Sequence, residues 1–451
     1  MGMSFQLFQE ELFSRGKKYG FEEMELYQNK NRSFKLRVFE QEVDHYALNV
    51  ERGVSLRAQK EGKMGYAYTE RMDQESIELL LEEVDESCQV VKESEEQIFS
   101  GSGDYKDVAP YNEELNQITP EEKMKLVLAL EKEARERDSR ITTVNHCLFS
   151  NLEVEEKVVN SSGLELDFKN NIAYMYLSVL AREDNIVKTA ADYFLSRDFS
   201  QFDSTQVAHS AVDEALAKLG AGPVASGSYP VVLRHDVVAD LLSAFSSTLS
   251  AENVQKGLSL FQNKLGEKVG TKQLTVYDDP FLEEGFRTRP FDAEGVASEK
   301  KCVIEEGKLN TFLHNLKTAR RAGVESTGNA YRDSHRSYVD ISPTNLYIKP
   351  GDTDREEIIS SVEDGLLITE LQGLHSGTNS VSGDFSLSAA GFVIKNGNRE
   401  RPLEQVTIAG NFLELLQDIR MVGSDLKLAL PGSSHIGAPS IKIGSLDVAG
   451  E

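Results

Sequence analysis

The chain has 451 residues, and its 74 acidic against 49 basic side chains give a formal net charge of −25. This charge argues against direct binding to nucleic acids or to an anionic membrane, because both are recognised largely through Lys and Arg. Hydrophobic residues make up 39% of the chain, and no apolar run approaches the roughly 20 residues of a membrane-spanning helix, so we expect a soluble globular protein.

The first hundred residues predict one helix followed by antiparallel strands. Apolar residues at helical spacing begin at Phe5, and Gly20 is a suitable stop. Alternating apolar residues between Met24 and Leu56 predict several short strands. Their connections are too short for parallel crossovers, so we expect an antiparallel meander. A further helix is predicted near Gln74–Val84.

A second set of elements follows after residue 110. Thr119 and Glu122 have the spacing of a capping box, with proline at the first helical position between them, and predict a helix that runs to about Arg137. Alternating apolar residues over Ile141–Leu195 predict strands, and an alanine-rich pattern predicts a helix over about Ser204–Leu219. This region therefore combines strands with flanking helices.

The segment Gly220–Pro230, which reads GAGPVASGSYP, predicts a linker because it is dense in small residues and proline. We therefore expect an N-terminal α+β lobe over residues 1–222, with sub-units at about 1–100 and 111–222. A C-terminal domain is expected over residues 223–451.

The C-terminal half is predicted to be mainly β. One helix pattern, over about His235–Leu249, stands among many short apolar runs separated by Gly, Pro, Asn and Asp. The fold class is therefore α+β: an N-terminal lobe of antiparallel sheets with flanking helices, followed by a mainly β domain that contains this helix.

The cysteines indicate a reducing environment. Cys88, Cys147 and Cys302 are odd in number and far apart, which fits neither a disulfide framework nor closely spaced zinc ligands. The first twenty residues lack the unbroken apolar stretch of a signal peptide. We expect a cytoplasmic protein.

The helix after the linker carries a candidate metal motif. Residues Pro230–Leu242 read PVVLRHDVVADLL and include His235, Asp236 and Asp240. A metallopeptidase helix needs metal ligands on one face and a carboxylate that takes a proton from metal-bound water. Positions five apart on an ideal helix are separated by roughly 140°, so ligands at this spacing need a local distortion or an offset metal. In the alternative interpretation, His235 and Asp236 begin and cap the helix while Asp240 faces solvent.

Longer segments of the second half carry a more specific pattern. They are YDDPFLEEGFRTRPFDAEGVAS (Tyr277–Ser298), LNTFLHNLKTARRAG (Leu309–Gly323), GTNSVSGDFSLSAAGFVIKNG (Gly377–Gly397), VTIAGNFLELLQDIRMVGSDL (Val406–Leu426) and the closing SIKIGSLDVAG. Together these segments resemble the TldD/PmbA family, once called modulators of DNA gyrase and regarded as metallopeptidase-related. The first half resembles the family more loosely.

The resemblance implies roles for the motif residues. TldD-type subunits carry His-Glu-x-x-x-His on this helix and a cysteine ligand near the C-terminus, whereas PmbA-type subunits, also called TldE, lack this set and pair with TldD. At the matching positions, His235 stands for the first ligand, Asp236 for the glutamate base and Asp240 for the second histidine. No cysteine lies near the C-terminus, where His435 is the only residue that could substitute as a ligand. The resemblance therefore implies a PmbA/TldE-type subunit with a degenerate zinc motif.

These replacements weaken the expected chemistry. Aspartate is one methylene shorter than glutamate, so Asp236 would hold its carboxylate about an ångström from the position of a general base, which can lower the rate ~100-fold. Carboxylate in place of imidazole or thiolate lowers the fit for zinc. Zinc is therefore expected either at a degenerate site formed by His235, Asp240 and His435 or in a partner subunit.

Three hypotheses for function follow. In the first, the chain is the non-catalytic subunit of a TldD/PmbA assembly that processes or degrades unfolded peptides, with a TldD-type subunit as partner. In the second, it is a divergent metallopeptidase active on its own. In the third, it is a non-hydrolytic homodimeric peptide-binding protein. None of the three involves direct contact with nucleic acid or a membrane.

Overall fold

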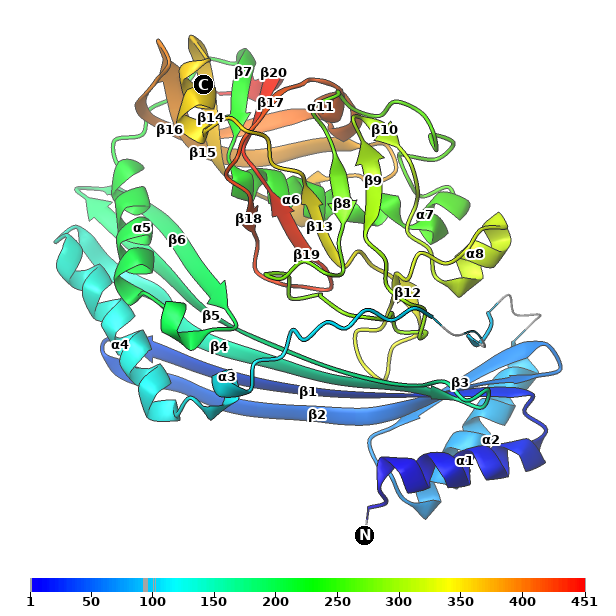
Figure 1. Cartoon of the computed structure of the whole chain (residues 1–451). Coiled ribbons are helices and arrows are strands. Elements are labelled where there is room, and N and C mark those ends of the chain that lie inside the picture. The colour runs from blue at the N-terminus through cyan, green and yellow to red at the C-terminus, as the bar shows by residue number, and fades with distance from the viewer. Residues whose placement is uncertain (1, 92–95, 100, 102, 451) are drawn as a thin grey trace.

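One six-stranded antiparallel sheet forms the N-terminal lobe, with strand order β3-β2-β1-β4-β5-β6 (Figure 1). The computed structural model describes residues 2–91, 96–99, 101 and 103–450. The strands are β1 (Glu23–Phe39), β2 (Glu42–Lys60), β3 (Lys63–Thr69), β4 (Ile141–Asn160), β5 (Glu165–Glu183) and β6 (Ile186–Ser196).

The predicted antiparallel meander is confirmed, but its strands are longer than expected. The alternating runs between Met24 and Leu56 belong to two long strands, β1 and β2, which pair from Glu23↔Gln59 to Phe39↔Glu42. β1 also pairs with β4 along its other edge. The polar residues in the middle of β1 therefore stay in the sheet, because the backbone groups on both sides of the strand are hydrogen-bonded. The residues before and after position 110 thus each contribute three strands to one sheet.

Helices cover the two ends of this sheet (Figure 1). The cap signals are confirmed: Gly20 ends the first helix with φ of 85°, in the left-handed region that favours glycine, and Thr119 and Glu122 form the expected capping box. The helical segments are α1 (Phe5–Tyr19), α2 (Gln74–Val90), α3 (Glu113–Gln117), α4 (Pro120–Arg137), a 3₁₀ turn (Phe199–Gln201) and α5 (Ser204–Ala217). The pair α1 and α2 packs on one apolar cluster of the sheet, and α4 and α5 pack on another. No helix in the described part of the chain is long and apolar enough to cross a bilayer.

Two further sheets build the mainly β C-terminal domain. The first has the order β16-β15-β14-β7-β20-β17, and an additional β16–β20 pairing closes it into a barrel. Its strands are β7 (Gly227–Leu233), β14 (Asp364–Gln372), β15 (Asp384–Lys395), β16 (Asn398–Asn411), β17 (Ile419–Val422) and β20 (Ile441–Ala449). The second sheet has the order β10-β9-β8-β13-β19-β18. Its strands are β8 (Val276–Asp278), β9 (Lys301–Glu305), β10 (Lys308–Leu309), β13 (Asn345–Ile348), β18 (Lys427–Leu428) and β19 (His435–Ala438), and β11 (Ala330–Tyr331) pairs separately with β12 (Asp340–Ile341).

Helix α6 (His235–Phe245) contributes to the apolar core between the barrel and the second sheet (Figure 1). The predicted helix continues beyond Phe245 as a 3₁₀ turn over Ser246–Leu249. The shorter C-terminal helices are α7 (Ala251–Gln255), α8 (Leu316–Ala322), α9 (Arg355–Ser360), α10 (Leu374–Gly377) and α11 (Phe412–Gln417).

The predicted linker is shorter than expected, because strand β7 begins inside it at Gly227. Pro230 lies in this strand, opposite the irregularity between Ile443 and Leu446 of β20. Proline has no backbone N–H to donate, and an interrupted ladder tolerates it. The strand then leads directly into α6.

A buried ionic network joins the N-terminal sheet to the C-terminal domain. Arg57 of β2 donates from Nη2 to Glu25 Oε2 of β1 at 2.7 Å and from Nη1 to Glu294 Oε1 of the C-terminal domain at 3.1 Å. Arg332 of the C-terminal domain reaches back to Glu25. All four side chains are at most 3% exposed. Each charge is therefore compensated across the junction between the lobes.

Substituting Arg57 by alanine tests the contribution of this network. We expect Arg57→Ala to lower the free energy of unfolding by about 3 kcal/mol, because it leaves Glu25 and Glu294 buried with fewer partners. Arg71→Ala is the control, since Arg71 is exposed and forms ion pairs with Asp73 and Glu75 close to it in the chain. Urea unfolding followed by circular dichroism measures both, and equal effects would contradict the assigned role.

Candidate functional site

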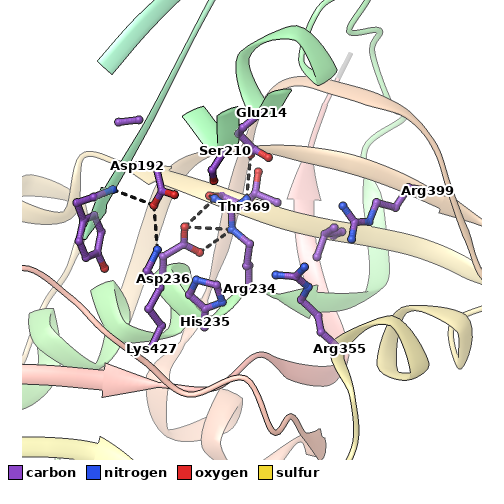
Figure 2. Close-up of a pocket in the computed structure, with 13 residues that line it drawn as sticks. Asp192, Ser210, Glu214, Arg234, His235, Asp236, Arg355, Thr369, Arg399 and Lys427 are labelled. Atoms are coloured by element: carbon purple, nitrogen blue, oxygen red, sulfur yellow. Dashed lines mark hydrogen bonds and ion pairs between the residues drawn. The ribbon is translucent and has the colours of Figure 1, made fainter. Parts of the chain in front are cut away.

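The start of α6 lines a polar pocket between the two lobes (Figure 2). Strand β7 pairs in parallel with β14 up to Leu233, so the chain leaves the barrel there and presents Arg234, His235 and Asp236 at the rim. The pocket has a volume of about 220 Å³. Its polar lining comprises Asp192, Tyr193, Ser210 and Glu214 of the N-terminal lobe and Arg234, His235, Asp236, Arg355, Thr369, Arg399 and Lys427 of the C-terminal domain.

Arg234 holds the carboxylate of Asp236 in a bidentate contact (Figure 2). Its Nε lies 2.9 Å from Asp236 Oδ1, and its Nη2 lies 2.6 Å from Oδ2. The same guanidinium donates to Glu214 Oε1 of α5 at 3.0 Å and to the Thr369 carbonyl of β14 at 2.8 Å. All three of its nitrogens are thus engaged, and they link both lobes at one point.

This contact also sets the ionisation of Asp236. Burial by itself would raise the pKa of Asp236, but the hydrogen bonds and charge of Arg234 lower it below its ordinary value. The Oδ1 atom additionally accepts the backbone N–H of Val237 at 3.0 Å. Asp236 is therefore an ionised carboxylate held by Arg234 at the first turn of α6. A general base needs its carboxylate directed at the proton it removes, and these contacts direct it elsewhere.

His235 is oriented by a separate carboxylate. Its Nδ1 lies 3.2 Å from Asp425 Oδ2, and its backbone N–H donates to Ser440 Oγ at 3.1 Å. Ser440 donates its hydroxyl to Asp425 Oδ2 at 2.7 Å. Burial opposes ionisation of Asp425, but the hydrogen bonds from His235 and Ser440 lower its pKa to about 2. Because the Ser440 hydroxyl donates to the carboxylate, the three groups do not form a nucleophile paired with an imidazole base.

Asp240 lies about one turn further along α6 and is partly buried. Burial, together with the negative charge of Asp236, raises the pKa of Asp240 to about 6. The alternative interpretation of the motif placed this side chain in solvent, and the structure instead leaves it partly covered.

His435 lies on β19, where its ring is fully buried. Its Nδ1 accepts the Phe286 N–H at 2.9 Å, and its Nε2 lies 2.7 Å from the Ala429 carbonyl oxygen. Burial lowers its pKa to about 4, so the ring is neutral near pH 7. Both ring nitrogens are therefore used within the fold, and a metal could bind only if one of these bonds broke.

The donor set does not fit a zinc ion in this arrangement. Zinc in proteins takes three or four converging nitrogen, sulfur or oxygen ligands. In residues 2–91, 96–99, 101 and 103–450, no group of three His, Cys, Asp or Glu side chains is placed to hold a metal. The guanidinium of Arg234 also brings positive charge to the carboxylate of Asp236, which follows His235 in the chain. The base role of Asp236 and the ligand roles of His235, Asp240 and His435 stay predictions.

The rest of the pocket wall is charged but internally paired. Lys427 Nζ lies 2.9 Å from Asp192 Oδ1, across the two lobes. Arg355 and Arg399 both approach Glu356. Thr369 lines the same pocket, and its buried Oγ1 has no hydrogen-bond partner among the described residues. The pocket can therefore accept a polar group of a ligand.

The sequence did not predict the residues that bond to the side chains of the motif. Arg234 directly precedes His235, but its role depends on Glu214, which lies 20 positions away, and on the end of strand β7. Asp425, the partner of His235, is 190 positions away. The arginine next to the motif was the one available signal. Only the fold shows which carboxylates it meets.

Comparison with known proteins identifies related chains. Models of three domains of the PmbA/TldA metallopeptidases match: domain 1 over residues 24–88, the central domain over 113–219 and the C-terminal domain over 226–450. A metalloprotease TldD homologue of Buchnera aphidicola (strain Sg) is 30% identical over 359 residues, covering 74% of each chain. A metalloprotease PmbA homologue of Buchnera aphidicola (strain APS) is 26% identical over 381 residues, covering 83% of this chain and 82% of the other.

Solved structures share the fold over nearly the whole chain. A protein of Thermotoga maritima, described as a candidate modulator of a DNA gyrase, superposes with a TM-score of 0.91 at 34% identity and covers 99% of this chain and 100% of its own. TldE from Thermococcus kodakarensis superposes with a TM-score of 0.90 at 25% identity and covers 98% of this chain and 100% of its own. Relatives named TldD and PmbA are about equally similar, so the degree of identity does not assign the subunit type.

Removing the Arg234 guanidinium should destabilise the junction at this pocket. We expect Arg234→Ala to lower the free energy of unfolding by about 2–3 kcal/mol, because two partly buried carboxylates lose charged hydrogen bonds. Arg399→Ala is the matched control, since Arg399 lines the same pocket but is 39% exposed and pairs at the surface. Urea unfolding compares the two variants, and a larger loss in Arg399→Ala would contradict this assignment.

The raised pKa of Asp240 predicts a pH-dependent penalty on stability. The folded state binds the proton of the Asp240 carboxyl group more tightly than the unfolded chain does, so ionisation of Asp240 destabilises the folded state. This loss of stability grows as the pH rises from 3.8 to about 6 and is constant at higher pH. Asp240→Asn should therefore be more stable than the wild type near pH 7, by at most about 3 kcal/mol, and equally stable near pH 4. Urea unfolding at both pH values tests this, with the exposed Asp352→Asn as control. A variant that is less stable near pH 7 would contradict the assignment.

Proposed function

Because the chain belongs to the PmbA/TldD metallopeptidase family, we propose that it is a PmbA/TldE-type subunit of a two-component assembly that processes or degrades unfolded peptides. Its partner in this proposal is a TldD-type chain that supplies the zinc and the catalytic base. Relatives are named both TldD and PmbA, and TldE superposes over nearly the whole chain, which supports a family with two kinds of subunit.

The observation that carries the proposal is the contact between Arg234 and Asp236. A zinc peptidase needs a carboxylate that is free to take a proton from metal-bound water. Here the carboxylate at that position is held by two guanidinium nitrogens, and His235 faces Asp425. The pocket has polar groups that can contact a peptide, while among the described residues no three His, Cys, Asp or Glu side chains are placed to hold a metal. A supporting role toward a catalytic partner therefore fits this geometry better than hydrolysis by the chain alone.

The formal charge of −25 bears on the names that link some relatives to DNA gyrase. Binding to duplex DNA depends on neutralising phosphates with Lys and Arg. We propose that any connection with gyrase is indirect and that the chain itself does not bind DNA.

A peptide-hydrolysis assay with purified chains tests the proposed function. We expect no hydrolysis of an unfolded peptide by this chain alone, and chelator-sensitive hydrolysis when a TldD-type chain from the same organism is added. Asp236→Ala in this chain should leave the activity of the mixture within about twofold, since the zinc and base belong to the partner. Chelator-sensitive hydrolysis by this chain alone, lost in His235→Ala, would overturn the proposal.

A further inference from the structure

The wall of the pocket between the two lobes carries more basic than acidic side chains. The basic ones are Arg234, Arg355, Arg399 and Lys427, and the acidic ones are Asp192, Glu214 and Asp236. Arg234 pairs with both Glu214 and Asp236. Lys427 pairs with Asp192. Among the described residues of the wall, no carboxylate is left for Arg355 or Arg399. This local excess of positive charge contrasts with the net charge of −25 of the whole chain.

Arg355 and Arg399 share one carboxylate that lies outside the wall. Arg399 pairs with Glu356, and Arg355 Nε lies 3.6 Å from the same Oε1 atom of Glu356 (Figure 2 shows the two arginines). Glu356 is 59% exposed, and ion pairs with exposed side chains contribute little. The Nε of Arg355 is buried and has no hydrogen-bond partner among the described residues. A guanidinium at the pocket wall is thus available to an acceptor on a ligand.

Thr369 supplies a second polar atom without a partner. The residue lies on β14 and is 4% exposed, and its Oγ1 has no hydrogen-bond partner among the described residues. Its carbonyl oxygen accepts from Arg234, so the backbone at this position is fixed while the hydroxyl stays unused. Leaving a buried hydroxyl without a hydrogen bond is unfavourable. A ligand oxygen in the pocket would relieve this, since Arg355 and Thr369 both line it.

The pocket has room for a small charged group and the carbon atoms that carry it. A single water needs about 10–15 Å³ of such a cavity, and the volume here is about 220 Å³. Ala191, Leu367 and the ring of Tyr193 provide apolar surface beside the charged residues. A ligand that fills the pocket therefore combines an anionic end with an aliphatic part.

A carboxylate fits these contacts better than a phosphate does. The fork of an arginine donates two parallel hydrogen bonds to the two oxygens of a carboxylate. A phosphate monoester carries up to two negative charges near pH 7, and three carboxylates already lie in the same wall. Repulsion by these carboxylates therefore disfavours a phosphate more than it disfavours a carboxylate with a single charge.

We propose that this pocket binds the C-terminal carboxylate of a peptide. Arg355 is the main partner of the carboxylate, Arg399 adds positive charge, and the hydroxyl of Thr369 donates to one carboxylate oxygen. The choice of a peptide as the ligand rests on the proposed function, whereas the unpartnered donors are properties of this chain. In the proposed assembly, this chain holds the end of a peptide that the TldD-type partner hydrolyses.

Isothermal titration calorimetry with the whole chain tests the role of the carboxylate. The probes are two N-acetylated penta-alanine peptides, of which one ends in a free carboxylate and the other in an amide. We expect the free acid to bind at least about tenfold more tightly, because the amide has no charge to pair with Arg355. Equal binding of the two peptides, or binding of neither, would overturn the proposal.

Variants of the whole chain locate the binding. Arg355→Ala should weaken binding of the free acid at least about tenfold and leave binding of the amide unchanged. Thr369→Val keeps the shape of the side chain and removes its hydroxyl, so it should weaken binding of the free acid about threefold. It should not lower the free energy of unfolding, because the hydroxyl has no partner among the described residues. Arg420→Ala is the matched control, since Arg420 is 63% exposed on β17 and lies outside the pocket lining. Circular dichroism verifies that all variants fold.

Two further results would overturn the proposal. One is an Arg355→Ala variant that binds the free acid as tightly as the wild type does. The other is displacement of the peptide by inorganic phosphate at a lower concentration than by acetate, which would identify a phosphate site. The titrations need neither a partner chain nor hydrolysis. If the mixture of chains hydrolyses peptides while the acid and the amide bind equally, only this inference fails. If the acid binds as expected and the mixture is inactive, only the proposed function fails.

Discussion

The guanidinium of Arg234 connects three elements of this molecule at a single point. It holds Asp236 at the start of α6, Glu214 on α5 and the Thr369 carbonyl on β14. Arginine suits this position because its planar fork meets several acceptors at once and keeps its charge when partly buried. The contact fixes where the N-terminal lobe meets the barrel, and it shapes the pocket between them.

The same contact decides what chemistry the first turn of α6 supports. A helix that begins at the end of a barrel strand can present a histidine and a carboxylate side by side, which is the arrangement that metal-assisted hydrolysis uses. Here Asp236 forms an ion pair with Arg234, and His235 contacts the carboxylate of Asp425. Both side chains are thereby bonded to partners within the fold. At the far end of the molecule, Arg57 and Arg332 serve a similar purpose for Glu25 and Glu294.

Local signals in the sequence predicted much of the fold. The stop at Gly20, the capping box of Thr119 and Glu122, the antiparallel order and the helix that begins at His235 are all present in the structure. These features depend on residues a few positions apart. The lengths of β1 and β2 were underestimated because polar residues inside a strand interrupt the apolar alternation without interrupting the backbone pairing.

The hydrogen-bond partners of the site residues could not be predicted from local sequence signals. The carboxylates around the motif come from positions that only the tertiary fold brings together, so the sequence showed which residues had changed but not what held them. His435 illustrates the difference, since proximity to the C-terminus suggested a ligand while both of its ring nitrogens bond within the domain. Burial and hydrogen bonding of a polar group are properties of the packed chain.

The contacts of Arg234 with Asp236 and of Asp425 with His235 imply that His235, Asp236 and Asp240 do not form a metal centre in this chain. Elemental analysis of protein purified without an affinity tag tests it directly. We expect far less than one equivalent of zinc per chain, with no difference between the wild type and His235→Ala. One equivalent of zinc per chain that is lost in His235→Ala would contradict it.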